Sequence, residues 1–194
     1  MMMTSNNQKK SISAVLALIL VLQMFSFIFT AFAANATVEI SNEKQFISFA
    51  KKCKTDSWSR GKTVVLKNDV DLSKTSFEPI ATFGGTFEGN GHTIKGVKIT
   101  KKGSYQGLFR YVQKTGVINN LNVSGSVIPD GTKSYVGGIC GQNSGIIKNS
   151  KFDGTVKGEG NVGGICGYQT ETGSIIASSF YGNVTANSYT GGIA

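Results

Sequence analysis

Apolar and polar residues alternate with a period of two in three similar segments of the C-terminal half of the chain. The positions of one parity are Leu121, Val123, Gly125, Val127; Ser150, Phe152, Gly154, Val156; and Ser178, Phe180, Gly182, Val184. Most residues between them are polar, as at Asn122, Ser124 and Ser126. A period of two places one set of side chains inside and the other in water. Each segment therefore predicts a half-buried strand of about 6 to 8 residues.

These strands belong to a longer repeat. Its copies start at Gly116, Gly145 and Gly173, which are 29 and 28 residues apart. A second block recurs as Tyr135-Val-Gly-Gly-Ile-Cys-Gly141, Asn161-Val-Gly-Gly-Ile-Cys-Gly167 and Tyr189-Thr-Gly-Gly-Ile-Ala194, with a looser copy at Gly107-Leu-Phe109. The unit is too short for a propeller blade of about 40 residues, and it lacks the leucine-rich consensus.

A single strand of this kind cannot bury its apolar face, whereas stacked copies cover one another. We therefore expect an all-β chain folded as a right-handed parallel β-helix, or β-solenoid, with one repeat in each coil. Equivalent residues then lie about 4.8 Å apart along the axis. Phe152 should lie over Phe180, and Val127, Val156 and Val184 should form a column.

The glycine content supports short strands and tight turns. All 25 glycines lie at or after Gly61, and the chain has two prolines. Gly-rich sequence mixed with Val, Ile, Phe and Asn is typical of strands and turns rather than disorder. The repeated glycine pairs suit sharp corners that need a positive φ or the absence of Cβ. These pairs are Gly137–Gly138, Gly163–Gly164 and Gly191–Gly192.

The segment before the repeats predicts a capping helix. Val38–Ile40 is expected to be a strand, and Ser41 or Asn42 then suits a helix N-cap. Apolar residues follow at a spacing of i, i+3, i+4 and i+7, which places them on one helical face; they are Phe46, Phe49, Ala50 and Cys53. Because the end of a β-helix exposes apolar side chains and unpaired strands, we expect this helix to cover it.

We assign residues 37–82 to this N-terminal cap and residues 83–194 to the β-helix. Thr63–Leu66 and Asn68–Leu72 are expected to be strands, and Asn90-Gly91 marks a tight turn. The last residues of the chain end inside a repeat, so we expect a truncated product whose further modules lie downstream of Ala194.

Residues 1–33 have the composition of a secretory signal peptide. A basic start at Lys9–Lys10 precedes an apolar stretch, Ile12–Phe32, that ends in small residues. Cleavage is expected after Ala33, with Ala36 as a second candidate. The alternative is an uncleaved membrane anchor, since the stretch is long enough to span a bilayer. In either case the rest of the chain is expected outside the cytoplasm, secreted or at the cell surface.

Without residues 1–33, 18 basic and 11 acidic side chains remain, a net charge of +7. A basic exported surface favours anionic wall polymers or acidic glycans, and the alternative is that the charge only maintains solubility. The expected partner is a cell-wall polymer, a host glycan or a host protein. Nucleic acid is not expected, because the chain has no recognition-helix or RNA-module pattern. Contact with a membrane is expected only through the N-terminal segment.

The Gly-Gly-Ile-Cys-Gly block and the Gly-x-Ile-x-Asn-Ser-x-Phe-x-Gly-x-Val unit resemble the GLUG-type repeats of bacterial surface proteins. Such repeats occur in filamentous-haemagglutinin-like adhesins and near the N-termini of immunoglobulin A metallopeptidases. The resemblance spans residues 83–194 in three ordered copies. It implies a β-solenoid scaffold exported to the cell surface, and it implies no catalytic residue.

The titratable residues give little indication of catalysis. His92 is the only histidine, which excludes a HExxH site and a two-histidine metal site within this chain. We interpret it as a hydrogen-bonded turn residue. Asp69 and Asp71 share a strand face with Glu88 expected nearby, and β-helix lyases and hydrolases use clustered carboxylates. The chain has no repeated Asp ladder, so we assign no catalytic, cofactor-binding or metal-binding residue.

Cys140 and Cys166 occupy the same position of the repeat, where other copies have Phe109 and Ala194. A position that accepts Phe, Cys and Ala is typical of an interior apolar site. Stacked Cα atoms about 5 Å apart would permit a disulfide. The favoured alternative is a pair of reduced thiols packed as small hydrophobic side chains.

Four tyrosines, Tyr135, Tyr168, Tyr181 and Tyr189, are candidates for an exposed aromatic stripe, although scattered surface tyrosines need no explanation. The leading hypothesis is an exported, non-catalytic surface scaffold or adhesin-like binding region of a larger bacterial protein. One alternative is an accessory N-terminal domain of a large secreted metallopeptidase. Another is a carbohydrate-active, polysaccharide-binding or lyase-like β-helix that uses Asp69, Asp71 and Glu88.

Overall fold

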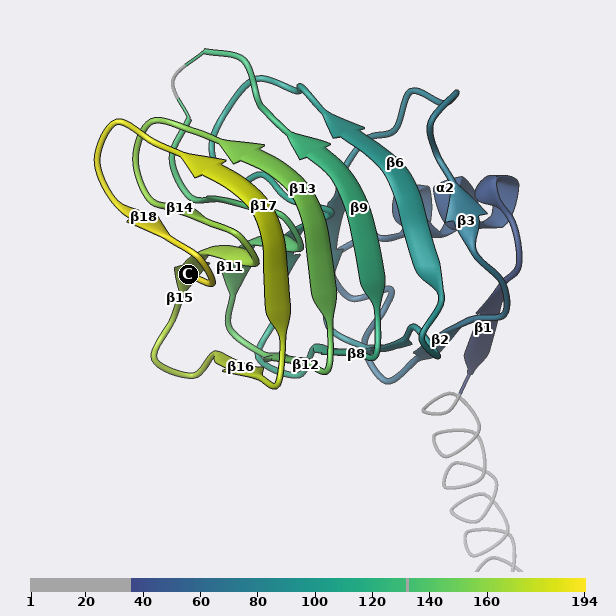
Figure 1. Cartoon of the computed structure of the whole chain (residues 1–194). Coiled ribbons are helices and arrows are strands. Elements are labelled where there is room, and N and C mark those ends of the chain that lie inside the picture. The colour runs from purple at the N-terminus through teal and green to yellow at the C-terminus, as the bar shows by residue number, and fades with distance from the viewer. Residues whose placement is uncertain (1–35, 132) are drawn as a thin grey trace, which may run out of the picture. The chain divides into compact units, whose positions relative to one another are not determined.

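The computed structural model describes residues 36–131 and 133–194, and in these residues it has eighteen strands and one helix (Figure 1). The strands form four sheets, which we name A to D. Sheet A contains β1 (Thr37–Ile40), β2 (Thr63–Leu66), β5 (Thr86–Glu88), β8 (Val117–Asn119), β12 (Ile146–Lys148) and β16 (Ser174–Ile176). Sheet B contains β3 (Val70–Asp71), β6 (Thr93–Ile99), β9 (Asn122–Val127), β13 (Lys151–Lys157) and β17 (Ser179–Thr185). Sheet C contains β4 (Ile80–Phe83), β7 (Phe109–Val112), β11 (Cys140–Asn143) and β15 (Cys166–Gln169). Sheet D contains β10 (Val136–Gly137), β14 (Val162–Gly163) and β18 (Thr190–Gly191).

Neighbouring strands in every sheet are parallel, and each comes from the next coil of the chain. A complete coil passes through sheets A, B, D and C before it returns to sheet A. The six strands of sheet A mark about six coils, which Figure 1 shows stacked from β1 to β17. The predicted all-β class, the parallel β-solenoid and the single short helix are therefore confirmed.

Equivalent residues of successive coils lie in register, which confirms the predicted columns. Phe152 pairs with Phe180, and their rings stack with centroids 6.2 Å apart and planes 8° apart. Val156 pairs with Val127 on one side and with Val184 on the other. Phe152, Val127 and Val156 are fully buried. Burial of one such side chain contributes about 1.5–3 kcal/mol to folding.

Of the two reasons that the sequence offers for the glycine pairs at the corners, the absence of a Cβ applies and a positive φ does not. None of the residues in the three pairs has a positive φ. A Cβ on Gly138 would lie 2.3 Å from Cγ of Phe152, and one on Gly163 would lie 2.0 Å from the carbonyl oxygen of Cys166. The coil bends so tightly here that the backbone fills the space of a side chain.

The corner between sheets A and B uses the left-handed backbone conformation instead. Asn90, Asn120, Asn149 and Ala177 occupy it in four coils, with φ of 53°, 51°, 50° and 46°. The predicted turn at Asn90-Gly91 is confirmed, since Gly91 also has a positive φ and the N–H of His92 donates to the carbonyl of Gly89 at 2.9 Å. Asn tolerates this conformation better than most residues because its short polar side chain bonds locally.

Helix α2 (Glu43–Lys52) follows β1 and begins as the sequence predicts. Its N-cap is Asn42, whose Oδ1 accepts a hydrogen bond from the N–H of Gln45 at 3.0 Å. The predicted apolar face is buried and contacts β1, β3 and β4. These are the first strands of sheets A, B and C, so the helix lies over three sheet edges at once.

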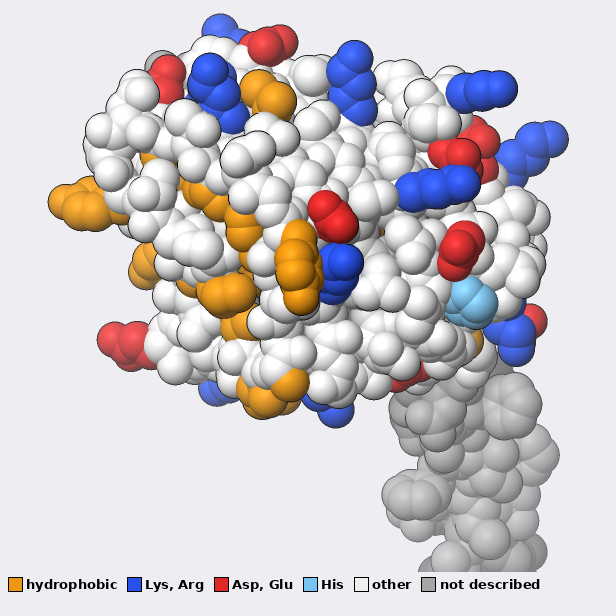
Figure 2. All heavy atoms as spheres, in the orientation of Figure 1, with side chains coloured by type: hydrophobic (Ala, Val, Ile, Leu, Met, Phe, Trp, Pro, Cys, Tyr) orange, Lys and Arg blue, Asp and Glu red, His pale blue; other side chains and the backbone are white. Residues whose placement is uncertain are grey.

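At the other end, the last coil exposes apolar side chains. The exposed fraction is 52% for Ile176, 57% for Tyr181 and 73% for Tyr189. Figure 2 shows hydrophobic side chains gathered near β17 and β18. The predicted signal peptide, residues 1–33, lies outside the described residues. Among residues 36–131 and 133–194, no helix has the length and apolar character needed to cross a membrane.

Candidate functional site

The carboxylates that the sequence singles out accept hydrogen bonds from backbone N–H groups at the ends of strands. Oδ1 of Asp69 accepts a hydrogen bond from the N–H of Thr93 at 2.9 Å and lies 3.3 Å from Nδ1 of His92. The backbone bond from Thr93 is the main reason that the pKa of Asp69 is lowered. Asp71 accepts from the N–H of Ser73 at 2.9 Å, and the hydroxyl and N–H of Ser73 lower the pKa of Asp71.

Glu88 contacts the same corner between β5 and β6 as Asp69, from the β5 side. Its carboxylate accepts hydrogen bonds from Nδ2 of Asn119 at 2.6 Å and from the N–H of Asn90 at 3.3 Å. Within the described part of the chain, no cluster of three or more His, Cys, Asp or Glu residues is arranged to hold a metal ion. The structure therefore gives Asp69, Asp71 and Glu88 hydrogen-bonding roles in turns, and it gives His92 the turn contact that the sequence predicts.

The three cysteines are buried, and the structure joins none of them in a disulfide. Cys140 and Cys166 are direct partners in sheet C, and Phe109 precedes them in the same column. Burial raises the pKa of the Cys140 thiol well above its ordinary value, and it raises the pKa of Cys53 to about 12. Because the thiolate is the reactive form, these groups are inert while the chain is folded.

Four tyrosines form a ladder beside sheet C. Tyr105 and Tyr135 stack with centroids 4.6 Å apart and planes 18° apart. Tyr111 lies 5.3 Å from Tyr105, and Tyr168 lies 5.3 Å from Tyr135. The guanidinium of Arg110 lies 5.5 Å from the Tyr111 ring centroid, and its Nε donates to the carbonyl of Tyr105 at 3.2 Å.

This ladder differs from the stripe that the sequence predicts. Tyr181 lies on β17 in sheet B with the ammonium of Lys151 4.5 Å from its ring centroid, and Tyr189 precedes β18. Sequence reasoning missed Tyr105 and Tyr111. The sequence did contain a signal for Tyr105. The segment Tyr105-Gln-Gly107 occupies the same position of the repeat as Tyr135-Val-Gly137.

The backbone at the ladder is unusual. Tyr105 and Tyr135 have φ of 57° and 61°, a left-handed conformation that is rare for bulky residues. Partial burial is the largest cause that raises the pKa of Tyr105, and the hydroxyls of the neighbouring tyrosines raise it further. Because the rings cover one another, the ladder chiefly stabilises contact between coils, as stacked aromatic pairs do.

The outer face of sheet B is polar and varies from coil to coil. One outward column contains Ser124, Asp153 and Tyr181, and the next contains Lys98, Ser126, Thr155 and Asn183. The inward column that follows the second of these along the strands contains Ile99, Val127, Val156 and Val184. The inward column therefore contains aliphatic side chains in every coil. The outward columns change between charged, hydroxyl, amide and aromatic side chains from one coil to the next.

Comparison with known proteins fits this architecture. The model of the GLUG motif matches residues 133–157. The chain is 30% identical over 165 residues to halomucin of Haloquadratum walsbyi, an alignment that covers 76% of this chain. It is 34% identical over 96 residues, or 43% of the chain, to a protein of Evansella cellulosilytica whose description includes the words "Gly-rich membrane protein". No solved structure matches the chain.

These alignments cover only small parts of the relatives, 2% of halomucin and 11% of the Evansella protein. Neither description names an enzyme, and the similarities fit a surface- or membrane-associated repeat region. The chain thus contains a GLUG repeat on a parallel β-solenoid.

Proposed function

We propose that this chain is an exported, non-catalytic scaffold at the bacterial cell surface, an adhesin-like binding region of a larger protein. The observation that carries the proposal is the contrast between constant inward columns and varied outward columns on sheet B. A solenoid of this kind changes its surface without changing its core, because each coil contacts only its neighbours. Its partner would be a cell-wall polymer, a host glycan or a host protein.

The proposal is supported by the length of the relatives. A region that aligns with a small fraction of a much longer protein is consistent with a module of a repetitive surface molecule. We include in this proposal the kinship with filamentous-haemagglutinin-like adhesins that the repeat sequence suggests. The alternative of an accessory N-terminal domain of an immunoglobulin A-type metallopeptidase predicts a HExxH motif after Ala194, which sequencing of the longer reading frame would reveal.

A carbohydrate-active β-helix is the remaining alternative. It would need a carboxylate of Asp69, Asp71 or Glu88 to leave its turn and act on a glycan. Calcium binding by the chain, or cleavage of an acidic glycan that is lost in the Asp71→Asn variant, would favour this alternative over a scaffold.

Surface display is tested with an epitope inserted after Lys114, an exposed residue in the turn between β7 and β8. In intact bacteria that express the full chain, an antibody should bind this epitope, and added protease should remove it. A cytoplasmic protein with the same epitope is the control and should react only after lysis. If the epitope on this chain also needs lysis, the proposed surface location is wrong.

A further inference from the structure

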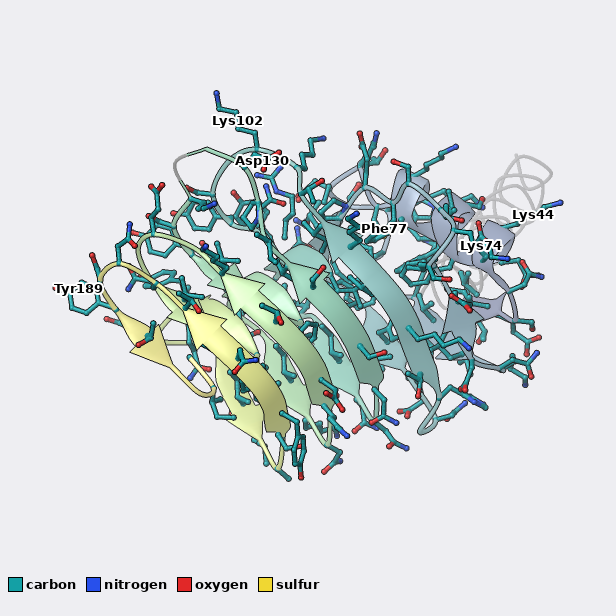
Figure 3. All side chains as sticks on the ribbon, turned by 45° about the horizontal axis from the view of Figure 1, so that its top comes forward. Lys44, Lys74, Phe77, Lys102, Asp130 and Tyr189 are labelled. Carbon is teal, nitrogen blue, oxygen red and sulfur yellow. The ribbon has the colours of Figure 1, made fainter. Side chains whose placement is uncertain are left out.

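Two hollows flank the loop that joins β3 to β4. The first, of about 300 Å³, lies between this loop and α2, and the second, of about 480 Å³, lies between the loop and the end of β6. Both are lined by Ser76, Phe77 and Glu78, so they meet along this short stretch. Figure 3 shows Phe77 beside β6, with Lys74 earlier in the same loop.

The charge in the two hollows is strongly basic. Lys51 and Lys54 line the first, Lys98 and Lys101 line the second, and Glu78 is the acidic residue of both. Nζ of Lys54 lies 3.0 Å and Nζ of Lys101 lies 3.4 Å from the Glu78 carboxylate. Hydrogen bonds from these two lysines lower the pKa of Glu78, so it stays ionised and holds both lysines beside the loop.

Two of the lysines remain available to a ligand. In the part of the chain that the structure describes, neither Lys51 nor Lys98 forms an ion pair. One stands in each hollow, on opposite sides of Phe77. An anionic polymer that lies across the loop would therefore meet an unpaired ammonium on each side.

Both hollows are lined partly by the aromatic ring of Phe77, which distinguishes between anionic polymers. Phe77 is half-buried with its ring 5.5 Å from that of Phe46, and Ile47 and Pro79 also line the first hollow. The hydroxyl-bearing residues Thr75, Ser76 and Thr100 line the second hollow, and the Thr75 hydroxyl donates to Glu43. A sugar ring has an apolar face of C–H groups and a polar rim, so it matches this combination, whereas a flexible polyol phosphate chain has no apolar face to place on Phe77.

We propose that the two hollows together form a binding site for a polysaccharide that contains uronic acids, with sugar rings against Phe77 and carboxylates beside Lys51 and Lys98. This inference rests on the proposed surface role, because it names the ligand class that the surface region would hold. The excess of lysine over acid attracts the polymer over a distance set by salt screening. The apolar and hydroxyl-bearing residues of the lining then select sugar rings among anionic polymers.

The site is tested by binding of oligogalacturonate to the full chain, purified in mild detergent and immobilised on a biosensor. The double variant Lys51→Gln, Lys98→Gln should weaken binding at least tenfold, and its melting temperature should not change, because neither lysine makes an ion pair. The matched control is Lys114→Gln, Lys148→Gln, which removes the same charge on other elements and should change binding less than twofold. Equal weakening in both double variants would mean diffuse attraction by net charge and would overturn the proposal.

Further probes separate ring recognition from charge. Phe77→Leu keeps an apolar side chain and removes the aromatic face, so it should weaken oligogalacturonate binding with little effect on folding. Neutral oligogalactan of the same length should not bind, and poly(glycerol phosphate) should bind more weakly than oligogalacturonate. The proposal is overturned if oligogalacturonate fails to bind or if either of the other two polymers binds as tightly. Such failure would leave the antibody test of surface display unaffected, so the two proposals can fail separately.

Discussion

At the scale of single residues, the corner between sheets A and B repeats one backbone conformation with different side chains. Three coils place Asn in the left-handed region, and the fourth places Ala177 there. For a residue other than Gly or Asn this conformation costs about 1–2 kcal/mol. In addition, Nδ2 of Asn149 donates to Oδ1 of Asn119 at 3.1 Å, a bond that alanine lacks.

We therefore predict that Ala177→Asn raises the stability of the chain by about 0.5–1 kcal/mol, since it relieves strain at a position where Asn is tolerated. The reciprocal variant, Asn149→Ala, should lower stability by a similar or larger amount. Chemical denaturation of both variants measures the two effects. A destabilised Ala177→Asn variant would show that the backbone conformation is not what limits this corner.

The register of sheet B gives a second prediction at this scale. Phe152→Asp should unfold the chain, because loss of a buried Phe costs about 3–5 kcal/mol and an unpaired buried charge costs several more. The neighbouring change Asp153→Lys should alter stability by less than about 0.5 kcal/mol, since Asp153 is exposed. Equal melting temperatures for the two variants would contradict the inward assignment of Phe152.

Alternation alone was enough to assign the inward residues of sheet B correctly. It did not indicate that Tyr105 and Tyr135 adopt a positive φ where the following coil approaches closely, since a Cβ on Gly141 or Gly167 would lie 2.4 Å or 2.2 Å from their backbone carbons. Such a contact joins residues more than thirty positions apart in sequence. Local propensity carries no information about it.

At the scale of elements, the tight corners depend on close approach between coils rather than on unusual φ. A Cβ on Gly138 would overlap the ring of Phe152 and the carbonyl of Gly164, whereas a Cβ on Gly192 would meet nothing within 4 Å. The two glycines occupy the same position of the repeat, in an inner coil and in the last coil. A comparison of the two glycines therefore separates the effect of close packing from the effect of the repeat position.

We predict that Gly138→Ala destabilises the chain by about 1–3 kcal/mol or more, as overpacking does, and that Gly192→Ala changes stability by less than about 0.5 kcal/mol. Thermal melts of both variants test this difference. If Gly192→Ala were as harmful as Gly138→Ala, glycine would be needed at this corner for its backbone freedom.

The cap gives the next prediction. Phe49 lies 5.9 Å from Phe83 and 5.7 Å from Phe87, measured between ring centroids, so α2 closes the end of the aromatic core. Deletion of residues 37–55 should expose this core and the edges of β2, β3 and β4, and so produce oligomers. Light scattering after gel filtration measures the mass, and circular dichroism reports whether the strands persist. A folded monomer would show that the helix is not needed as a cap.

The helix and the strands could be predicted because their patterns are local: a face at helical spacing in one case and a period of two in the other. The basic hollows and the tyrosine ladder could not. The hollows unite Lys51 of α2, Phe77 of a loop and Lys98 of β6, elements brought together only by the first coils. The signal available in the sequence was limited to a lone aromatic residue, Phe77, in a polar loop.

At the scale of the whole molecule, stability should decrease from the capped end toward the last coil. In a solenoid, each coil is stabilised by its own contacts and by its two neighbours. Within the described residues, the first coils are covered by α2, whereas the coil of β16 and β17 exposes Ile176 and Tyr181 and pairs with the preceding coil. Regions with fewer buried apolar contacts open at lower free energy than the core.

The three buried thiols report on this gradient, because Cys53 is the C-cap residue of α2, Cys140 lies in an inner coil and Cys166 lies in the last strand of sheet C. Iodoacetamide should label Cys166 fastest, then Cys140, and Cys53 slowest, as mass spectrometry of the labelled peptides would measure. Phe180→Ala, which weakens only the last coil, should speed the labelling of Cys166 and leave that of Cys53 unchanged. Equal rates at the three cysteines would mean that the solenoid opens as one cooperative unit. Labelling in denaturant should modify all three thiols, and protection of both Cys140 and Cys166 there would instead reveal a disulfide between adjacent coils.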